Sequence, residues 1–549
     1  MMIPLRRSFI VQEHETLLYP EGRACASVLI AGDKGGDCAR NAFFGVGVAF
    51  LYAFLQKVLH AIAGVPAYVT SAANKYFPAA TFNAEITPEY LGMGYIIGVR
   101  SSGIMFAGGL LSWLCFIPLL ATLVPPDVVA AQLVKLGELP DVLSAGGPGG
   151  WDPASHSFAA YPAALYKAYV RQIGAGAVAC AGFITLLKTL PVIVTSFKSS
   201  LNSLKQRGTV AISKRTDTDL PLSVVLVGIA AVTLAICFVP GIPGETIANR
   251  LAMALLVLFF GFFFVTVSTR IVGIIGSSSN PISGMTIASL MGTCLCFILL
   301  RWTGITYEPM ALAVVSMICI IVACSGACMQ AHKAGYLLGA TPKNQQIAYI
   351  VGLISAACVG AATTIMLDKP TADLAAQGMN HMIGTNAFPA PQGTLMATLV
   401  RGLLAFNLDW QYVIVGAVVA LAISLCGVSP LSFAVGIYLP LSTTLPIFVG
   451  GMVRSCTDAA RGKKAEASDD LGSGSLFATG LIAGGALAGV AVAMCSVNDG
   501  VNAFINNISL APALTGALGQ GGYNILGVIC FALLAAVLVR FALRQDSPN

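Results

Sequence analysis

A polar stretch containing proline interrupts an apolar region of the chain where a membrane would not tolerate loose backbone. Residues 277–286 read Ser-Ser-Ser-Asn-Pro-Ile-Ser-Gly-Met-Thr and lie between the apolar runs 250–272 and 285–300. In hydrocarbon each unpaired backbone N–H or C=O is costly, so irregular backbone persists there only where protein buries it or where it lines a water-filled cavity. The stretch therefore predicts non-helical backbone beside a solute pathway, as in the broken helices of secondary transporters.

The composition is that of a polytopic membrane protein. Apolar residues make up 56% of the 549 residues, and Asp, Glu, Lys and Arg only 10%, against about 25% charged residues in soluble domains. Two stretches, 90–124 and 430–452, are apolar but punctuated by Gly and Pro. The sequence predicts an all-α polytopic integral membrane protein of about 12–14 membrane elements, including discontinuous or re-entrant segments. The uninterrupted helix-length runs are 42–64, 172–197, 220–240, 250–272, 285–300, 309–328, 346–366, 411–428, 475–497 and 523–544.

The sequence lacks the motifs that are typical of several function classes. It contains no GxxxxGK[ST] phosphate loop, no HExxH or GxSxG motif, and no CxxC or Cys/His zinc spacing among its 15 Cys. The net charge of +6 is modest, and its basic residues gather in short loops, as the positive-inside rule requires, rather than in a nucleic-acid-binding patch. We therefore expect no enzyme, no cofactor, no bound metal and no nucleic-acid partner.

The basic loops also give an expected domain organisation. Segment 1–41 and the loops 198–219, 329–345 and 453–474 are predicted to be cytoplasmic, because Lys and Arg are enriched in them. The long segments 125–170 and 367–410 are poorer in basic residues and are predicted to be external loops. The first membrane half would then cover 42–328 and the second 346–549, in a multi-pass protein of the inner or plasma membrane.

The two punctuated stretches resemble one another. Aligning 94–109 with 436–451 matches Gly94 to Gly436, Phe106 to Phe448 and the terminal Gly-Gly pairs. A helix rich in small residues follows each stretch, at 174–182 and at 478–486. The pattern indicates an internal duplication, with chance matching of Gly-rich apolar text as the alternative. Paired broken segments in two halves point to a transporter site, and the sequence leaves open whether the halves are parallel or inverted.

Four motifs occurring in order resemble those of the oligopeptide transporter (OPT) family. They are Tyr19-Pro-Glu-Gly-Arg-Ala-Cys-Ala, 280–286, 335–342 (Gly-Tyr-Leu-Leu-Gly-Ala-Thr-Pro) and 436–442 (Gly-Ile-Tyr-Leu-Pro-Leu-Ser). The resemblance covers about residues 3–490 and is closest to bacterial members, which are similar to the plant yellow stripe-like metal-chelate transporters. It implies proton-coupled uptake of small peptides or of peptide-like metal chelates.

One feature departs from the family pattern. Members usually carry several membrane helices before the Tyr-Pro-Glu-Gly motif, whereas eighteen residues precede Tyr19 here. The sequence therefore predicts a chain that is short at its N-terminus, through a start codon assigned too far downstream or through truncation.

The interrupted segment at 277–286 supplies the first candidates for substrate binding. Asn280, Ser283, Gly284 and Thr286 offer amide, hydroxyl and backbone groups that Pro281 and Gly284 keep out of regular helix. The alternative interpretation is a tight turn between two helices at the membrane surface.

Two cations and two tyrosines extend this set. Lys188 lies inside the run 172–197, and Arg100 lies in the middle of the stretch 90–124. A charge at membrane depth needs a partner, here a substrate carboxylate or a buried acid, unless the side chain reaches the interface. Tyr95 and Tyr438 occupy nearly equivalent places in the repeat and suit a peptide backbone, with core packing as the alternative. The same stretch of the second repeat adds Ser442 and Thr443.

Few acids lie near the predicted membrane helices. Burial raises the pKa of a carboxyl toward the working range, which makes each a candidate for proton coupling, with a solvated interfacial acid as the alternative. His332, in the expected loop 329–345, is interpreted as an ordinary loop histidine. The candidate acids are Glu21, Glu85, Glu89 and Glu308.

These observations favour a secondary active, proton-coupled transporter of oligopeptides. Uptake of peptide-like metal chelates, of the siderophore or nicotianamine type, is the alternative within transport. A passive channel or an intramembrane enzyme is the alternative from a different class. The expected partners are the peptide or chelate, protons and the lipid bilayer, and the Gly-rich helix faces are compatible with a homodimer.

Overall fold

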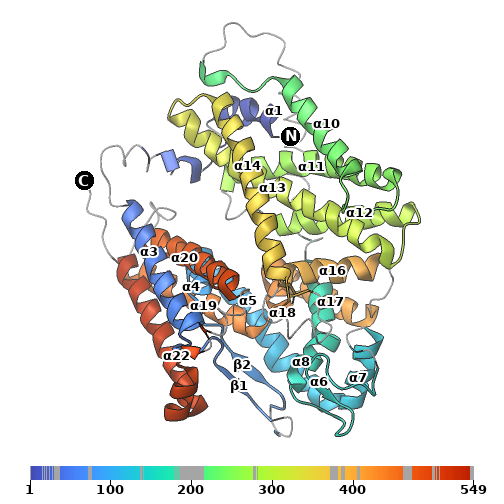
Figure 1. The fold of residues 1–549 in the computed structure, drawn as a ribbon, viewed down its shortest axis with the longest axis vertical. Helices are drawn as coiled ribbons and strands as arrows, with labels where there is room; N and C mark the ends of the chain where they lie inside the picture. Colours follow the sequence, from blue (N-terminus) through green and yellow to red (C-terminus); the bar gives the residue numbers. More distant parts are fainter. Residues whose placement is uncertain are drawn as a thin grey trace. The chain divides into compact units, whose positions relative to one another are not determined.

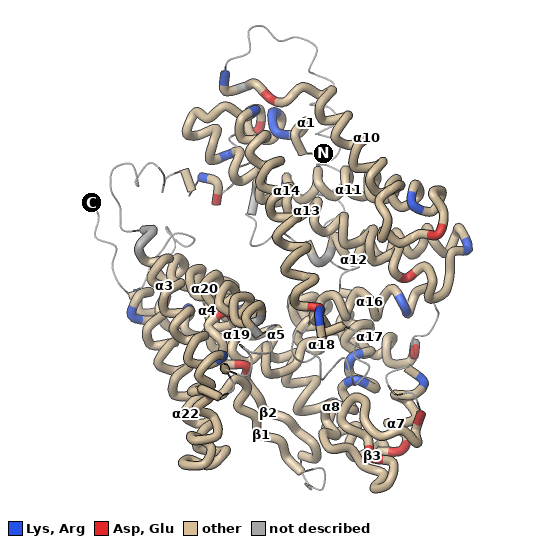
Figure 2. Tube along the Cα trace, in the orientation of Figure 1, with Lys and Arg blue, Asp and Glu red and all other residues tan. Residues whose placement is uncertain are grey.

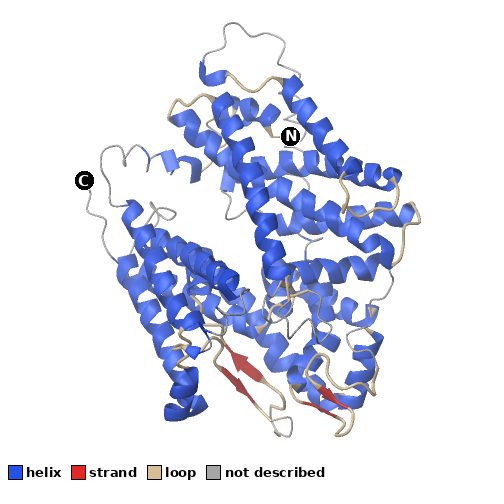
Figure 3. Cartoon of the chain, viewed as in Figure 1, coloured by secondary structure: helices blue, strands red, loops and turns tan. Residues whose placement is uncertain are grey.

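The structure is a computed structural model, and almost all of its secondary structure is helical (Figure 3). Two small antiparallel hairpins, β1 (Ala67–Val69) with β2 (Thr81–Asn83) and β3 (Trp151–Asp152) with β4 (Ser157–Phe158), are the strands among the described residues. The expected all-α class is confirmed. The described residues are 2–14, 17, 19, 21–23, 25–26, 29, 38–71, 74, 77–136, 139, 141–178, 180–181, 184, 215–275, 280, 282–370, 381–384, 390–404, 409–461, 473–496, 501, 504–505 and 507–543.

Six helical segments of the described chain are long and apolar enough to cross a membrane. Four shorter apolar helices accompany them, and the charged residues gather at helix ends and in connections (Figure 2). The protein is therefore a polytopic membrane protein, as the sequence predicts. The six long segments are Val99–Leu123, Ile247–Gly273, Ile305–Leu337, Pro342–Asp368, Ser473–Val492 and Ala511–Leu543, and the shorter ones are Phe43–Val58, Leu222–Phe238, Met285–Leu299 and Gln411–Leu425.

The chain forms two compact units, each assembled from separated stretches. Unit 1 comprises residues 1–36, 182–362 and 392–408, and unit 2 comprises residues 37–181, 363–391 and 409–549. The division into consecutive halves at residue 328 stays a prediction about topology.

Unit 1 is built around the contact of α11 (Ile247–Ile275) with α13 (Glu308–Leu337), beside α10 (Leu222–Phe238) and α12 (Ile282–Leu299). Helix α14 (Pro342–Asp368) begins in this unit, and α16 (Pro391–Leu404) contributes most of its length. The N-terminal segment adds α1 (Ile3–Arg6) and η1 (Arg7–Gln12), and the short turns η6 (Arg215–Asp217) and η7 (Ile305–Tyr307) precede α10 and α13.

Two local expectations in unit 1 are wrong. The non-helical stretch expected through Thr286 ends earlier, because α12 begins at Ile282. The Ile282 N–H donates to the Asn280 backbone carbonyl oxygen at 2.8 Å, so the chain already turns at Asn280 and the helix follows directly. The loop expected from residue 329 instead follows Leu337, because α13 continues through that position.

Unit 2 contains α3 (Cys38–Ala53), α20 (Ser473–Ser496) and α22 (Ala511–Leu543), which lie side by side in Figure 1. The expected external loop 125–170 contains secondary structure of its own, and its Trp151 and Tyr169 are buried in an apolar cluster with Trp113 and Leu441. The remaining elements are η2 (Phe54–Val58), α4 (Pro88–Ile97), α5 (Val99–Leu110), η3 (Leu111–Phe116), α6 (Ile117–Leu123), α7 (Pro126–Lys135), α8 (Tyr161–Leu165), η4 (Tyr166–Val170), α17 (Trp410–Leu425), α18 (Pro430–Tyr438) and α19 (Leu441–Arg461).

The two punctuated stretches form interrupted helices that break at aligned positions. Helix α4 ends before Gly98, whose φ of 83° favours glycine, and α5 starts at the next residue. Helix α18 ends before Leu439 and Pro440, and α19 starts at Leu441. In the sequence alignment Gly98 corresponds to Pro440, so a glycine makes one break and a proline, which lacks an N–H, makes the other.

Contacts between the interrupted helices repeat about a pseudo-two-fold axis. A methyl group on Gly94 would lie 1.9 Å from the Ile447 carbonyl oxygen, and one on Gly436 would lie 2.0 Å from that of Met105. Gly94 is aligned with Gly436, and Met105 with Ile447. Replacing each residue of the first contact by its aligned equivalent therefore gives the second contact. A contact that pairs i with j and j with i in this way is the signature of two-fold symmetry.

A second pair of contacts shows the direction of the two stretches. Gly108 approaches the carbonyl oxygen of Phe433, and Gly450 approaches that of Leu91, each within 2.2 Å of an added methyl group. Early residues of one stretch therefore meet late residues of the other, so the stretches run antiparallel and the axis is perpendicular to the helices. For helices that cross a bilayer, such an axis lies in the membrane plane, which is the geometry of an inverted repeat.

This close approach makes a prediction for helix packing. We expect Gly450→Ala to lower the free energy of unfolding by about 1–3 kcal/mol, the usual cost of overpacking, because its methyl group would meet backbone that cannot move aside. Gly352→Ala in α14 is the matched control, since nothing lies within 4 Å of that position. Thermal unfolding in detergent measures both, and equal melting temperatures would contradict the close crossing.

Candidate functional site

The breaks in the interrupted helices leave carbonyl groups that require partners. At the end of α4, the Arg454 guanidinium donates hydrogen bonds to the carbonyl oxygens of Ile96 (2.8 Å) and Tyr95 (3.4 Å). At the end of α18, the Tyr166 hydroxyl donates to the carbonyl oxygen of Tyr438. Ile96 and Tyr438 are aligned equivalents, so the same position in each repeat is capped by a different side chain.

The predicted tyrosines lie inside this crossing. Tyr95 and Tyr438 are both 4% exposed, and a methyl group on Gly474 would lie 2.3 Å from the Tyr95 hydroxyl oxygen. Both side chains thus pack in the interior of unit 2. Their carbonyl groups, rather than their hydroxyls, take part in the caps described above.

The residues that begin the second half-helices differ in exposure. Arg100 is exposed in the first turn of α5, and its aligned equivalent Ser442 is buried in the first turn of α19. The Ser442 carbonyl accepts a hydrogen bond from the N–H of Glu85 at 2.8 Å, and Thr443 hydrogen-bonds with the side chain of Tyr90. The structure therefore brings Ser442 and Thr443 next to the segment that carries two of the candidate acids, Glu85 and Glu89.

That segment forms an acidic cluster with one lysine. The Nζ of Lys57 lies 3.8 Å from Oε1 of Glu89 in the first turn of α4, and the other Glu89 oxygen is buried without a hydrogen-bond partner. Burial is the largest influence on Glu85, in the connection before α4, and it raises the pKa of that carboxyl above its ordinary value. Nearby Lys57 opposes this shift and Glu89 adds to it.

Glycines on α20 make room for the side chains of Glu89 and Lys57. A methyl group on Gly485 would lie 2.4 Å from the Glu89 carboxyl carbon, and one on Gly489 would lie 2.9 Å from the Lys57 nitrogen. Residues four apart share a helix face, so the pair lies along one groove of α20. Sequence reasoning missed Lys57, although a lysine inside the run 42–64 was the signal that could have found it.

In unit 1, Asn280 cross-links two membrane helices. Its amide donates to the Ser268 hydroxyl oxygen at 2.9 Å, and that hydroxyl donates to the Val322 carbonyl oxygen at 3.3 Å. The Asn280 carbonyl oxygen is buried without a hydrogen-bond partner, so it could accept from a ligand. Thr286 instead bonds to Ile282 in its own helix.

The other predicted residues of unit 1 come from separate parts of the sequence. Ser283 and Gly284 lie in the first turn of α12, and Lys188 lies outside the described residues. Glu308, in the first turn of α13, pairs with Arg401 of α16 at 3.3 Å.

The Tyr-Pro-Glu-Gly motif docks against α11 and α13. The Tyr19 hydroxyl donates to the Thr269 carbonyl oxygen at 3.0 Å, and the Gly22 N–H donates to Oε1 of Gln330 at 2.7 Å. The Gln330 amide donates in turn to the Glu21 carboxylate. A methyl group on Gly22 would lie 2.3 Å from the backbone carbonyl oxygen of Gln330, which explains why the motif needs glycine here. The proton-coupling candidate Glu21 is thus held in a structural contact.

A buried lysine is satisfied by the same N-terminal segment. Lys333 of α13 is 1% exposed, and its ammonium donates to the carbonyl oxygens of His14 (3.1 Å) and Leu17 (2.9 Å). It also lies 3.0 Å from Nδ1 of His14. The N-terminal segment therefore supplies the acceptors that a buried cation on a membrane helix requires.

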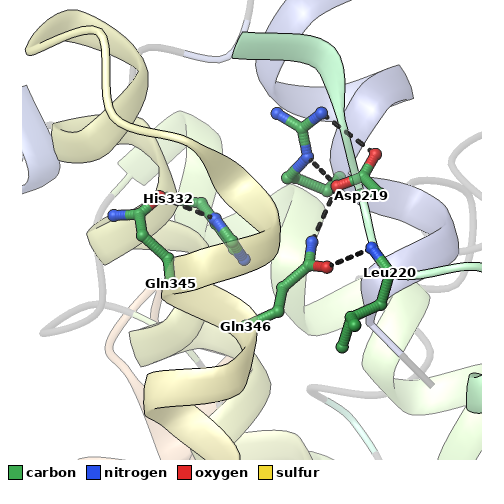
Figure 4. Close-up of polar contacts among 6 residues, drawn as sticks. Asp219, Leu220, His332, Gln345 and Gln346 are labelled. Atoms are coloured by element: carbon green, nitrogen blue, oxygen red, sulfur yellow. Dashed lines mark hydrogen bonds and ion pairs between the residues drawn. The ribbon is translucent and has the colours of Figure 1, made fainter. Parts of the chain in front are cut away.

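A second polar cluster joins α1, the segment just before α10, and α14. The Arg6 guanidinium binds both carboxylate oxygens of Asp219, and Gln346 donates to Asp219 at 2.7 Å while accepting from the Leu220 N–H at 2.8 Å. Figure 4 shows Gln346 between Asp219 and Leu220. The fork geometry of the guanidinium makes this a bidentate pair, the stronger kind of ion pair.

The interpretation of His332 as a loop residue is wrong. It is 1% exposed on α13, and its Nδ1 lies 3.2 Å from Oε1 of Gln345 (Figure 4). Its ring packs edge-on against Tyr349, with the ring centroids 5.1 Å apart. The polar run Gln330 to Lys333 follows directly on an apolar run, and this position inside a continuing helix is the signal that could have identified it.

The capping side chains generate a prediction. We expect Arg454→Leu to lower the free energy of unfolding by about 1.5–3 kcal/mol, as for other hydrogen bonds to charged groups, because it leaves two carbonyl groups at the α4 break without their donor. Arg540→Leu is the control, since Arg540 is exposed near the end of α22. Thermal unfolding with and without substrate measures the effect, and an unchanged melting temperature for Arg454→Leu would refute this role.

Comparisons with known proteins agree on one family. The family model described as OPT oligopeptide transporter protein matches residues 1–496. A protein of Haemophilus influenzae named "Putative oligopeptide transporter" is 29% identical over 527 residues, which cover 89% of this chain and 78% of that protein.

Proposed function

Because the chain belongs to the oligopeptide transporter family, a family of membrane transporters, we propose that it carries oligopeptides across the plasma membrane by secondary active transport driven by protons. The name of the Haemophilus influenzae relative supports the substrate class. The observation that carries the proposal is the antiparallel crossing of α4–α5 with α18–α19, whose contacts repeat about a pseudo-two-fold axis.

Inverted repeats suit alternating access. Two stretches related by an axis in the membrane plane can exchange their conformations, which turns a site open to one side into a site open to the other. The breaks at Gly98 and Pro440 supply hinges within the crossing, because Gly98 has a φ of 83°, outside the helical range, and Pro440 has no N–H to donate.

The chemistry at the breaks matches a peptide. The first turn of α5 places the exposed Arg100 guanidinium beside the N-terminal end of a helix, and both attract a carboxylate such as the peptide C-terminus. The buried hydroxyl of Ser442 starts the equivalent helix and can donate to a peptide carbonyl.

The acidic cluster supplies a proton acceptor next to this site. Burial raises the pKa of Glu85, so this carboxyl takes up a proton at a higher pH than a solvated glutamate. Protonation removes a charge from the cluster that it shares with Lys57 and Glu89. Since the Glu85 N–H is bonded to Ser442, that change occurs one hydrogen bond away from the start of α19.

Transport assays test the proposal directly. We expect proteoliposomes containing the protein to accumulate a labelled tripeptide when the outside is acidic, and to lose the accumulation when an uncoupler collapses the pH gradient. Liposomes without protein are the control. Undiminished accumulation after uncoupling would exclude proton coupling, and uptake that never exceeds equilibrium under a gradient would indicate a passive pathway.

The acidic cluster generates a separate prediction on pH dependence. Wild-type uptake should fall as pH rises through the raised pKa of Glu85, because the carboxyl then loses its proton. Glu85→Gln mimics the protonated form at every pH, so we expect it to abolish concentrative uptake, to retain peptide exchange across the membrane, and to remove the pH dependence.

Glu245→Gln is the matched control, because Glu245 is an exposed acid of the other unit. It should behave as wild type in both assays. A Glu85→Gln protein that still accumulates peptide with the wild-type pH profile would remove Glu85 from the coupling mechanism.

A further inference from the structure

Unit 1 contains an apolar groove that the transport mechanism proposed above does not use. It has a volume of about 530 Å³ and lies between α10, α11, α13 and α14. This volume falls within the roughly 300–1,000 Å³ typical of small-molecule sites. Its walls are almost entirely aliphatic, with Val224, Gly228 and Val232 on α10 and Ile350 and Leu353 on α14.

The size of the groove restricts what can fill it. A membrane helix of about 20 residues spans about 30 Å with a diameter of about 10 Å, which corresponds to roughly 2,000 Å³. The groove is several times smaller, so it does not enclose a whole helix from a second copy of the chain. A single hydrocarbon chain is long, thin and apolar along its length, as the groove requires.

One end of the groove is polar. Gln346 and Tyr349 line it from α14, and the Tyr349 hydroxyl is buried without a hydrogen-bond partner. These residues are three apart and therefore share a helix face. Leu220, which also lines the groove, follows Asp219 of the ion pair with Arg6. An ester or glycerol oxygen at this end would give the Tyr349 hydroxyl the acceptor that it lacks.

Exposed basic residues surround the same end. The Arg215 side chain is held over the α13–α14 connection by bonds to Thr341 (2.9 Å) and to the Gly339 carbonyl oxygen (3.0 Å). Lys343 is exposed at the start of α14, where its N–H binds the Thr218 carbonyl oxygen. Arg6 and Asp219 neutralise each other, and Arg215 and Lys343 outnumber Asp217, so this end keeps a net positive charge.

We propose that the groove binds one anionic phospholipid of the surrounding bilayer. One acyl chain lies between α10 and α14, the ester region hydrogen-bonds to Tyr349 and Gln346, and the phosphate lies near Arg215 and Lys343. Basic sites between membrane helices attract acidic headgroups. The lipid connects α14 to α10 and α11 through its chain.

Native mass spectrometry of the full chain tests the site. The protein is transferred from nanodiscs containing equal amounts of phosphatidylglycerol and phosphatidylcholine, and the retained lipid is identified. We expect wild type to retain one phosphatidylglycerol. Gly228→Trp, which fills the groove from a position with open space around it, should lower the retained lipid at least tenfold. Val227→Trp, one residue along α10 and outside the groove, should retain it as wild type does.

Further variants test the headgroup and the fold. The double variant Arg215→Gln, Lys343→Gln should lose the preference for phosphatidylglycerol over phosphatidylcholine, and Tyr349→Phe should weaken retention of both. If Gly228→Trp does not yield folded protein, Leu353→Trp fills the groove from the opposite wall. It should lower the retained lipid in the same way.

Three results would overturn the proposal. The first is equal lipid retention by the groove-filling variant and the Val227→Trp control. The second is equal retention of the two phospholipids by wild type, which would show that the site does not select an anionic headgroup. The third is a lipid-free dimer that Gly228→Trp dissociates, which would assign the groove to a second copy of the chain.

Discussion

Carbonyl groups at a break in a membrane helix must find donors inside the protein, since hydrocarbon offers none. In unit 2, the carbonyl groups at the two equivalent breaks accept hydrogen bonds from different side chains. Arg454 reaches the Ile96 carbonyl oxygen at 2.8 Å, whereas Tyr166 reaches that of Tyr438. The residue aligned with Arg454 is Ser112, whose side chain is too short to span the same distance. The backbone is therefore nearly symmetric while its caps are not, so opening one break disrupts charge-assisted hydrogen bonds and opening the other disrupts a neutral one.

The N-terminal motif solves a comparable problem in unit 1. Helix α13 carries Gln330 and Lys333 on a face that lipid would not tolerate. Carbonyl oxygens of the N-terminal segment accept from the Lys333 ammonium, and the Gly22 N–H donates to Oε1 of the Gln330 side chain. The motif that identifies the family thus has a structural task in this chain, and Gly22 is required because no side chain fits against α13.

Features that depend on periodicity and on breaks could be predicted from the sequence, whereas those that depend on long-range partners could not. The helix-length runs and the interruptions near Gly98 and Pro440 are local properties, and the alignment of 94–109 with 436–451 even matches residues that are related by the pseudo-two-fold axis. The partners of Lys57 and Lys333 come from distant stretches. Helix ends were misplaced where polar residues continue a helix in the protein interior, as at His332, because hydropathy alone cannot distinguish that case from a loop.

The location of the acidic cluster has a consequence for energy coupling. A proton can shift a conformational equilibrium only by the difference in its binding free energy between the two states, so its acceptor must feel the conformational change. In the mechanism proposed above, Glu85 would meet this condition, because its N–H donates to the Ser442 carbonyl oxygen at 2.8 Å and its carboxyl is influenced by Lys57 and Glu89. A movement of α19 about the break at Pro440 would then alter the burial of Glu85, and the charge on Glu85 would bias that movement in return.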